Sequence, residues 1–193
     1  TLYRTGDLVL PDDVTVVFSD YGRTSIMKDA FWEHDPQKPQ PAGIYYHLGF
    51  WSTGPTDHMG VTLDKIDFNL RKAFEKNATD YLLVNVSNVR EHLLGACALA
   101  EISNTGIDSI DPKTYTEQWC AQRWGQAHAA QVAALYEAFL AAIPKSPAPT
   151  RYPQFPKLLH DGVLRLLIEF ILGLLAKGEV SDATYLAGYT TNT

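Results

Sequence analysis

The run YLLVNVS at residues 81–87 constrains the fold more than any other stretch of the sequence. It is apolar on both faces, which is typical of a strand in a parallel sheet that helices cover. Two other short runs predict strands, VTVVFS at 14–19 and GIYYHL at 43–48. A connection rich in proline and charge separates these two, and a helix precedes the third strand. Strands that alternate with helices predict an α/β fold with a parallel sheet.

Four helices are expected in the first three quarters of the chain. Thr62 can cap the first of them, which spans 63–77. Its apolar residues recur at helical spacing, namely Leu63, Ile66, Leu70, Ala73 and Phe74. The other three are predicted at 89–103, 112–124 and 126–143.

A stretch with five prolines, residues 144–156, indicates a domain boundary or an extended connector. We therefore predict one domain over residues 1–145. Residues 146–193 would form the connector and the start of a helical region, which includes an apolar helix at 163–176.

Charge and motif content argue against several functions. The net charge is −6, and lysine and arginine are scattered, which argues against nucleic acid or an anionic membrane as a partner. The apolar segment 163–176 is too short to span a bilayer. The sequence has no glycine-rich phosphate loop, HExxH or GxSxG motif, and we expect no cofactor and no metal. His47 and His58 flank a loop with Asp57, which keeps a metal site as a minor alternative.

Polar side chains follow all three predicted strands at their carboxyl ends. They are Asp20, His47 and the group Asn85, Ser87 and Asn88. In parallel α/β folds this edge of the sheet builds the site, so these side chains are expected to meet there. Each also has an ordinary structural role open to it, because aspartate forms turns, histidine can lie in a core and asparagine caps helices.

Aromatic residues crowd the same stretches. Rings that stack on apolar sugar faces, beside polar groups that bind hydroxyls, are the general chemistry of carbohydrate binding. The candidate rings are Tyr21, Tyr45, Tyr46, Phe50 and Trp51. Because side chains alternate along a strand, Tyr45 is predicted on the same side as His47, and Tyr46 in the core or helix layer.

Four motifs, taken in order, resemble one family. They are FSDYG (18–22), GIYYHLGFWSTGP (43–55), VNVSNVRE (84–91) and DPKTYTEQWCAQRWG (111–125). This order is similar to that in the xylan α-glucuronidases of glycoside hydrolase family 115, over roughly residues 12–145. The resemblance implies part of a (β/α)8 TIM-like barrel with parallel strands, followed by a C-terminal helical segment, with His47 in a sugar-acid pocket.

The sequence departs from the family pattern at polar positions. Asp20 stands where the family has an acid-acid-amide run, and Phe50 replaces a tyrosine. The family pattern N-V-G-D is N-V-S-N here, so that Asn88 replaces a carboxylate. These differences indicate a divergent member with an altered ligand, or one that no longer hydrolyses glucuronic acid linkages.

The resemblance implies a glycoside hydrolase that removes glucuronic or methylglucuronic acid side chains from xylan or a related plant polysaccharide. The fragment alone is expected to be inactive, since the barrel takes about 250 residues. The candidate catalytic carboxylates are Asp20 and Glu91, although Glu91 can equally serve the first turn of its helix. The substrate-binding candidates are Tyr21, Tyr45, His47, Trp51, Asn85 and Asn88.

Two other hypotheses stay open. One is a catalytically inactive carbohydrate-binding relic of the same fold, and the other is an unrelated α/β domain in which Asp20, His47 and Asn88 do not converge. The expected partners are a uronic-acid-bearing polysaccharide or oligosaccharide and the remaining domains of the same polypeptide, with a homodimer as a further option. The resemblance also implies a secreted or periplasmic protein.

Overall fold

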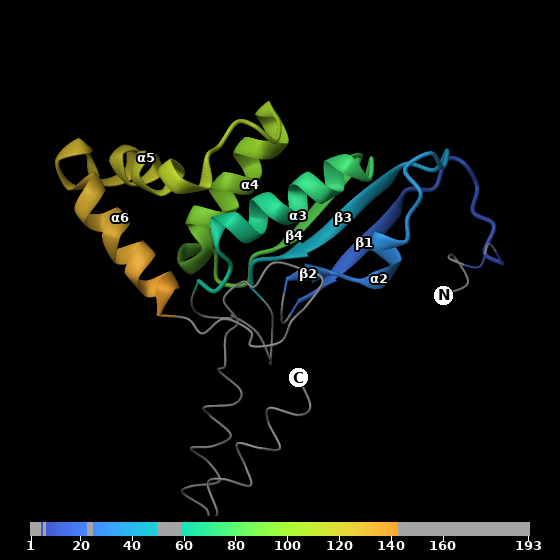
Figure 1. The fold of residues 1–193 in the computed structure, drawn as a ribbon, viewed down its shortest axis with the longest axis horizontal. Coiled ribbons are helices and arrows are strands. Elements are labelled where there is room, and N and C mark those ends of the chain that lie inside the picture. Colours follow the sequence, from blue (N-terminus) through green and yellow to red (C-terminus); the bar gives the residue numbers. More distant parts are fainter. Residues whose placement is uncertain (1–4, 6, 23–24, 50–58, 143–193) are drawn as a thin grey trace, which may run out of the picture.

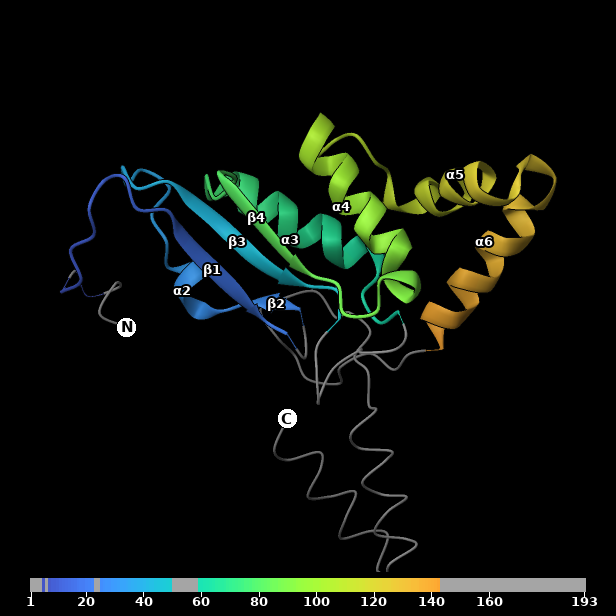
Figure 2. The same cartoon turned by 180° about the vertical axis from the view of Figure 1, so that it is seen from behind.

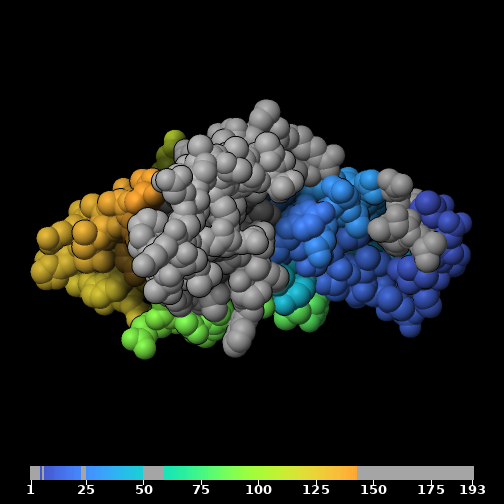
Figure 3. All heavy atoms as spheres, turned by 90° about the horizontal axis from the view of Figure 1, so that it is seen from below, coloured from blue at the N-terminus to red at the C-terminus, as the bar shows by residue number. Residues whose placement is uncertain are grey.

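The structure, a computed structural model, describes residue 5 and residues 7–22, 25–49 and 59–142 (Figure 1). The predicted connector and apolar helix at 146–193 lie outside the described residues, as do Phe50 and Trp51. Seen from below, the N-terminal residues and α6 (Gln126–Ala141) lie at opposite ends of the molecule (Figure 3).

The sheet has four strands in the order β2-β1-β3-β4. Their bounds are β1 Val16–Tyr21, β2 Ile26–Met27, β3 Ala42–His47 and β4 Tyr81–Asn85. β1, β3 and β4 are parallel, which confirms the three predicted strands and their common direction. The short strand β2 is antiparallel to β1 and was not predicted.

The helices follow the sequence pattern closely. They are α2 Asp29–Trp32, α3 Leu63–Glu75, α4 Leu93–Thr105, α5 Pro112–Trp124 and α6, with a 3₁₀ turn η1 at Val89–His92. Thr62 caps α3 as predicted, through its hydroxyl and the backbone N–H of Lys65. The predicted helix at 89–103 instead begins with η1. α2 lies in the segment that we expected to be a plain connection, because a single helical turn leaves too short a periodic pattern to detect.

One face of the sheet carries the hydrophobic core. Phe18, Ile44 and Leu82 are aligned across β1, β3 and β4, and they face α3 and α4. Both ribbon views place these two helices on the same side of the sheet (Figures 1 and 2). α2 joins this layer through Phe31, whose ring lies edge-on to Phe18 with the centroids 6.0 Å apart.

The opposite face of the sheet is open. Val17, Tyr81 and Leu83 point to this side and are 43–47% exposed. Within the described part of the chain, these three side chains stay accessible to water. An apolar face of this kind is unusual in a parallel sheet, because such sheets are normally buried on both sides.

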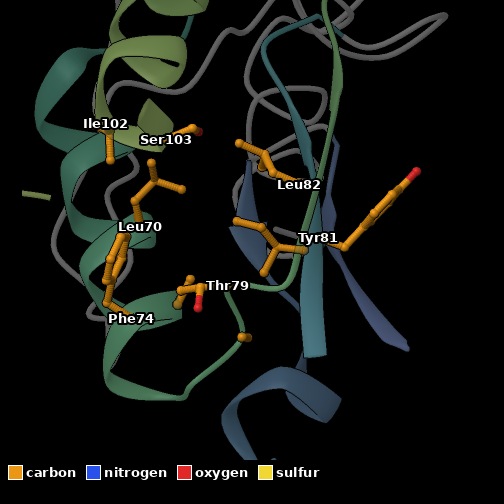
Figure 4. A pocket seen from close by; sticks show the side chains of 10 residues that line it. Leu70, Phe74, Thr79, Tyr81, Leu82, Ile102 and Ser103 are labelled. Carbon is orange, nitrogen blue, oxygen red and sulfur yellow. The ribbon is translucent and has the colours of Figure 1, made fainter. Parts of the chain in front are cut away.

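A cavity of about 110 Å³ lies between α3, β4 and α4, near the amino end of β4. Leu70 and Phe74 face Leu82 across it, whereas the Tyr81 side chain points away toward the open face (Figure 4). Phe74 is 44% exposed at this rim, although its spacing suggested a core residue. The cavity is at the end of the sheet opposite to the polar strand ends.

Gly43 is required by the close approach of β3 and β4. A Cβ atom at this position would lie 2.2 Å from the backbone oxygen of Tyr81. We expect Gly43→Ala to lower the free energy of unfolding by about 2 kcal/mol or more, since the strands cannot move apart without breaking their ladder. Urea unfolding followed by circular dichroism measures this change.

Gly95→Ala is the matched control. Its Cβ would lie 3.1 Å from Cδ2 of Leu48, which is a movable side-chain atom, and alanine favours the helix. If both variants unfold at the same urea concentration, close packing at Gly43 does not limit the sheet.

Candidate functional site

The candidate site lies where β1, β3 and β4 end. Asp20 is the penultimate residue of β1, whereas His47 and Asn85 are the last residues of β3 and β4. His47 and Asn85 are paired in register. The common direction of the strands therefore brings together three of the predicted residues at one edge.

Asp20 and His47 form a buried pair. The backbone N–H of His47 donates to Oδ2 of Asp20 at 3.0 Å, and Nδ1 of the His47 ring contacts Oδ1. Both residues are less than 5% exposed. A carboxylate at Nδ1 holds the ring proton there, which leaves Nε2 as the proton-accepting atom of the neutral ring.

Tyr45 and Asn85 extend this pair across the sheet. The ring centroid of Tyr45 is 4.4 Å from that of His47, and the Asn85 amide donates to the Tyr45 hydroxyl at 3.3 Å. Tyr46 is fully buried on the helix side of β3. The predicted division of the two tyrosines between opposite faces is confirmed.

The other predicted residues are more peripheral. Tyr21 is 49% exposed, and Nζ of Lys28 lies 5.6 Å from its ring centroid. Asn88 occupies the N-cap position of η1 without a side-chain cap bond, and it is exposed. The Glu91 side chain is 34% exposed, with Oε1 3.9 Å from Nε of Arg90. No contact within the described ranges joins Asn88 or Glu91 to the Asp20–His47 pair, so their roles stay predictions.

Sequence reasoning missed a second set of polar residues behind the pair. Lys65 and Asn69 of α3 are buried, one helical turn apart. The Asn69 amide donates to the backbone oxygen of Ser25 at 3.0 Å, and the Ser25 hydroxyl donates to the backbone oxygen of His47 at 3.0 Å. The only sequence signal for their burial was that Lys65 and Asn69 immediately precede Ile66 and Leu70, two of the apolar residues that recur at helical spacing in α3.

Burial changes the ionisation of two groups in this layer. It lowers the pKa of Lys65 to about 8, against an opposing effect of the Asp20 carboxylate. It also raises the pKa of the Tyr46 hydroxyl, and the negative charge of Asp20 acts in the same direction. Near neutral pH, Lys65 is therefore still mainly protonated and Tyr46 is neutral.

Strained backbone flanks the site on both sides. Ser25 and Ser87 have φ of 49° and 56°, in the left-handed region that favours glycine. Ser87 follows the end of β4, and its N–H donates to Oδ1 of Asn85 at 3.2 Å. Such strain often accumulates at functional sites, because the surrounding structure must impose it.

The arrangement can bind and orient a polar ligand. His47 offers a ring held by a carboxylate, Tyr45 offers an aromatic face, and Asn85 offers an amide. These groups suit a sugar, whose hydroxyls need hydrogen bonds and whose ring faces are apolar. In the described ranges, no cluster of three histidine, cysteine or acidic residues could hold a metal ion, and no helix is long and apolar enough to span a membrane.

Ser87→Gly should relieve the left-handed strain. We expect the free energy of unfolding to rise by up to about 1 kcal/mol, because glycine adopts φ near 56° without a steric penalty. Denaturant unfolding measures this. Ser109→Gly, at an exposed loop residue, should give no gain. A loss of stability in Ser87→Gly would instead mean that the serine side chain stabilises the turn.

The folding stability should depend on the ionisation of Lys65. The unfolded chain keeps the Lys65 proton up to a pKa near 10.5, whereas the folded chain loses it near 8. Between these values the unfolded state binds more protons, so stability should rise with pH. We expect wild type to gain about 1 to 2 kcal/mol relative to Lys65→Met between about pH 7.5 and about pH 9.5. Parallel unfolding curves at both pH values would contradict this.

Comparisons with known proteins agree with the motif order. The profile of Glycosyl hydrolase family 115 matches residues 1–146. A solved structure, described as a family GH115 4-O-methyl-alpha-glucuronidase with specificity for decorated arabinogalactans, is similar with a TM-score of 0.60 and 16% identity. The match covers 76% of this chain and 20% of that chain, so this chain spans about a fifth of its length. No curated protein matches. The chain belongs to glycosyl hydrolase family 115.

Proposed function

We propose that this chain is part of the catalytic barrel of a glycoside hydrolase. The enzyme removes glucuronic or methylglucuronic acid side chains from xylan or a related plant polysaccharide. The observation that carries the proposal is the cluster of Asp20, His47, Tyr45 and Asn85 at the carboxyl ends of three parallel strands. Family membership adds the reaction class.

The open face of the sheet supports a barrel completed by other segments of the same polypeptide. Val17, Tyr81 and Leu83 are apolar residues that water reaches in the described structure. In a barrel this face would be the interior, where side chains from all strands pack in layers. β4 has no partner on its outer edge among the described strands, so a further strand could pair there.

Under this proposal, Asp20 and the carboxylates that react with the sugar have different roles. Most glycoside hydrolases use two carboxyl groups that flank the scissile bond. Both oxygens of Asp20 contact His47, an arrangement that suits a carboxylate orienting the ring rather than one attacking the sugar. The carboxylates that react would then come from Glu91 or from strands elsewhere in the polypeptide, and the fragment alone would be inactive.

A carbohydrate-binding protein without hydrolase activity is the second candidate. Asn88 stands where the family pattern has a carboxylate, and it is exposed beside the end of β4. Its amide can bind a sugar hydroxyl but cannot act as a general acid or base. Under this alternative the cluster still binds uronic acid and the linkage is not cleaved.

The proposed partners are a uronic-acid-bearing glycan and the remaining domains of the same polypeptide, with a homodimer as a further proposal. Secretion or a periplasmic location would place the protein with such glycans. The solved relative is described as specific for decorated arabinogalactans, so the glycan is best chosen by experiment.

The test is release of glucuronic acid by the full-length protein that contains this chain. Glucuronate-decorated xylan oligomers and arabinogalactan are the substrates. We expect His47→Gln and Asp20→Asn each to lower kcat/KM by about 10²-fold or more, as expected when a proton-transfer group or its orientation is lost. His128→Gln and Asp108→Asn, at exposed positions, are the matched controls and should leave activity unchanged.

Three outcomes separate the candidates. Release that depends on His47 and Asp20 supports the hydrolase. Uronic acid binding without release, weakened by the same substitutions, supports the binding protein. If neither substitution affects binding or release, the cluster is not the site.

A further inference from the structure

Ser25 is a buried serine that holds the end of β3. It is 1% exposed, and its hydroxyl donates to the backbone oxygen of His47 at 3.0 Å. The pairing of β1 with β3 ends at Ser19 and Tyr45, before His47 is reached. Beyond that point, side chains bond to both backbone groups of His47. The Asp20 carboxylate accepts from the N–H, and the Ser25 hydroxyl donates to the C=O.

Hydrogen bonds also fix Ser25 itself. Its N–H donates to the backbone oxygen of Tyr21 at 2.7 Å, and its backbone oxygen accepts the Asn69 amide of α3 at 3.0 Å. All three polar groups of this residue are thus bonded, as buried polar groups normally are. Tyr21 directly follows Asp20 at the end of β1, so Ser25 and Asp20 are held together where they meet His47.

The backbone conformation of Ser25 indicates that its side chain has a role. Its φ of 49° lies in the left-handed region, where glycine would be less strained. A glycine would keep the backbone bonds to Tyr21 and Asn69, but it would remove this donor from the His47 backbone oxygen. The bond to His47 is therefore what serine adds over glycine at this position.

The end of β3 is also held on its other side, by β4. The N–H of Leu48 donates to the backbone oxygen of Asn85 at 2.9 Å. A strand end that is bonded on one side only can swing about that side, and the bonds from Asp20 and Ser25 oppose this movement. The Asp20 carboxylate also contacts the ring of His47, so a shift of the β3 end would change the ring position as well.

We propose, building on the hydrolase function proposed above, that Ser25 is a positioning residue for His47. Its hydroxyl fixes the end of β3, so that the His47 ring stays against the Asp20 carboxylate and faces the substrate. Without the hydroxyl, the end of β3 shifts and the ring is less often in the reactive geometry. The reaction then slows, since a proton-transfer group must lie within hydrogen-bond reach of its target. Binding of the sugar through Tyr45 and Asn85 remains.

The experiment compares the full-length protein with its Ser25→Gly and Ser25→Ala variants. Both variants lose the hydroxyl, but glycine relieves the strain at φ 49° and alanine keeps it. We expect kcat for glucuronic acid release to fall about tenfold or more in both, with KM within about threefold of wild type, the effect of a misplaced catalytic group. Urea unfolding should show that Ser25→Gly is the more stable of the two.

Ser103→Ala is the matched control. The Ser103 hydroxyl donates to the backbone oxygen of Leu99 at 2.7 Å, and Ser103 lines the cavity at the opposite end of the sheet. This variant loses the same kind of hydrogen bond, so its kcat and KM should match those of wild type. If Ser25 had a purely structural role, activity would follow stability, and Ser25→Gly would be close to wild type.

A spectroscopic measurement tests the positioning without hydrolysis. Labelling with ¹³C-carbonyl histidine and ¹⁵N-leucine selects His–Leu peptides, of which this sequence has two, His47–Leu48 and His92–Leu93. We expect the His47–Leu48 signal to move in both Ser25 variants, because the His47 carbonyl loses a hydrogen bond. The His92–Leu93 signal is the internal reference and should not move. His47→Gln identifies the first signal by its loss.

The two measurements separate the outcomes. A moved His47–Leu48 signal together with a lower kcat in both variants supports the proposal. An unmoved signal, or a kcat in Ser25→Gly equal to that of wild type, overturns it. If Ser25→Ala fails to fold, Ser25→Gly is sufficient for both measurements. If wild type releases no glucuronic acid, the hydrolase proposal fails, whereas the signal still decides whether Ser25 holds His47.

Discussion

The carboxylate of Asp20 accepts hydrogen bonds from both the backbone and the ring of His47, away from water, and the polar edge of the sheet depends on this contact. A buried carboxylate is costly unless its charge is compensated and its oxygens are hydrogen-bonded. The backbone N–H and the ring of His47 contact the two oxygens of this carboxylate. Because adjacent parallel strands hold Asp20 and His47, the sheet register determines the geometry of the pair.

The helix layer behind the sheet has two functions. Its apolar residues build the core with Phe18 and Ile44, whereas its polar residue Asn69 bonds to the backbone of Ser25 beside the strand ends. A fully buried amide in the middle of a helix is seldom favourable unless it is hydrogen-bonded. Asn69 bonds to Ser25, and the strained conformation of Ser25 places its hydroxyl on His47. The packing of the helix is thereby coupled to the orientation of the site.

The two faces of the sheet differ in how far other elements cover them. In the described chain, α2, α3 and α4 pack against the core face. The other face exposes Val17, Tyr81 and Leu83, and it carries Tyr45, which packs against His47. The same surface therefore combines an apolar area that needs burial with the aromatic side of the candidate site, as the interior and mouth of a barrel would.

The sequence alone determined the local elements. Apolar runs, a capping threonine and helical periodicity predicted three strands and four helices, and alternation within GIYYHL assigned Tyr45 and Tyr46 to opposite faces. Motif order was sufficient for the family. These features depend on neighbours in the chain, so they can be recognised without coordinates.

Only the tertiary structure decided which groups meet. Asp20 and His47 are 27 residues apart, and the ring contact to Oδ1 follows from how β1 and β3 pair. Lys65 and Asn69 were missed because a lysine at the edge of an apolar stripe normally extends into water, and burial depends on what packs above it. The short β2 and α2 were missed because so few residues give no periodic signal. Long-range packing, rather than local pattern, converts separate polar residues into one site.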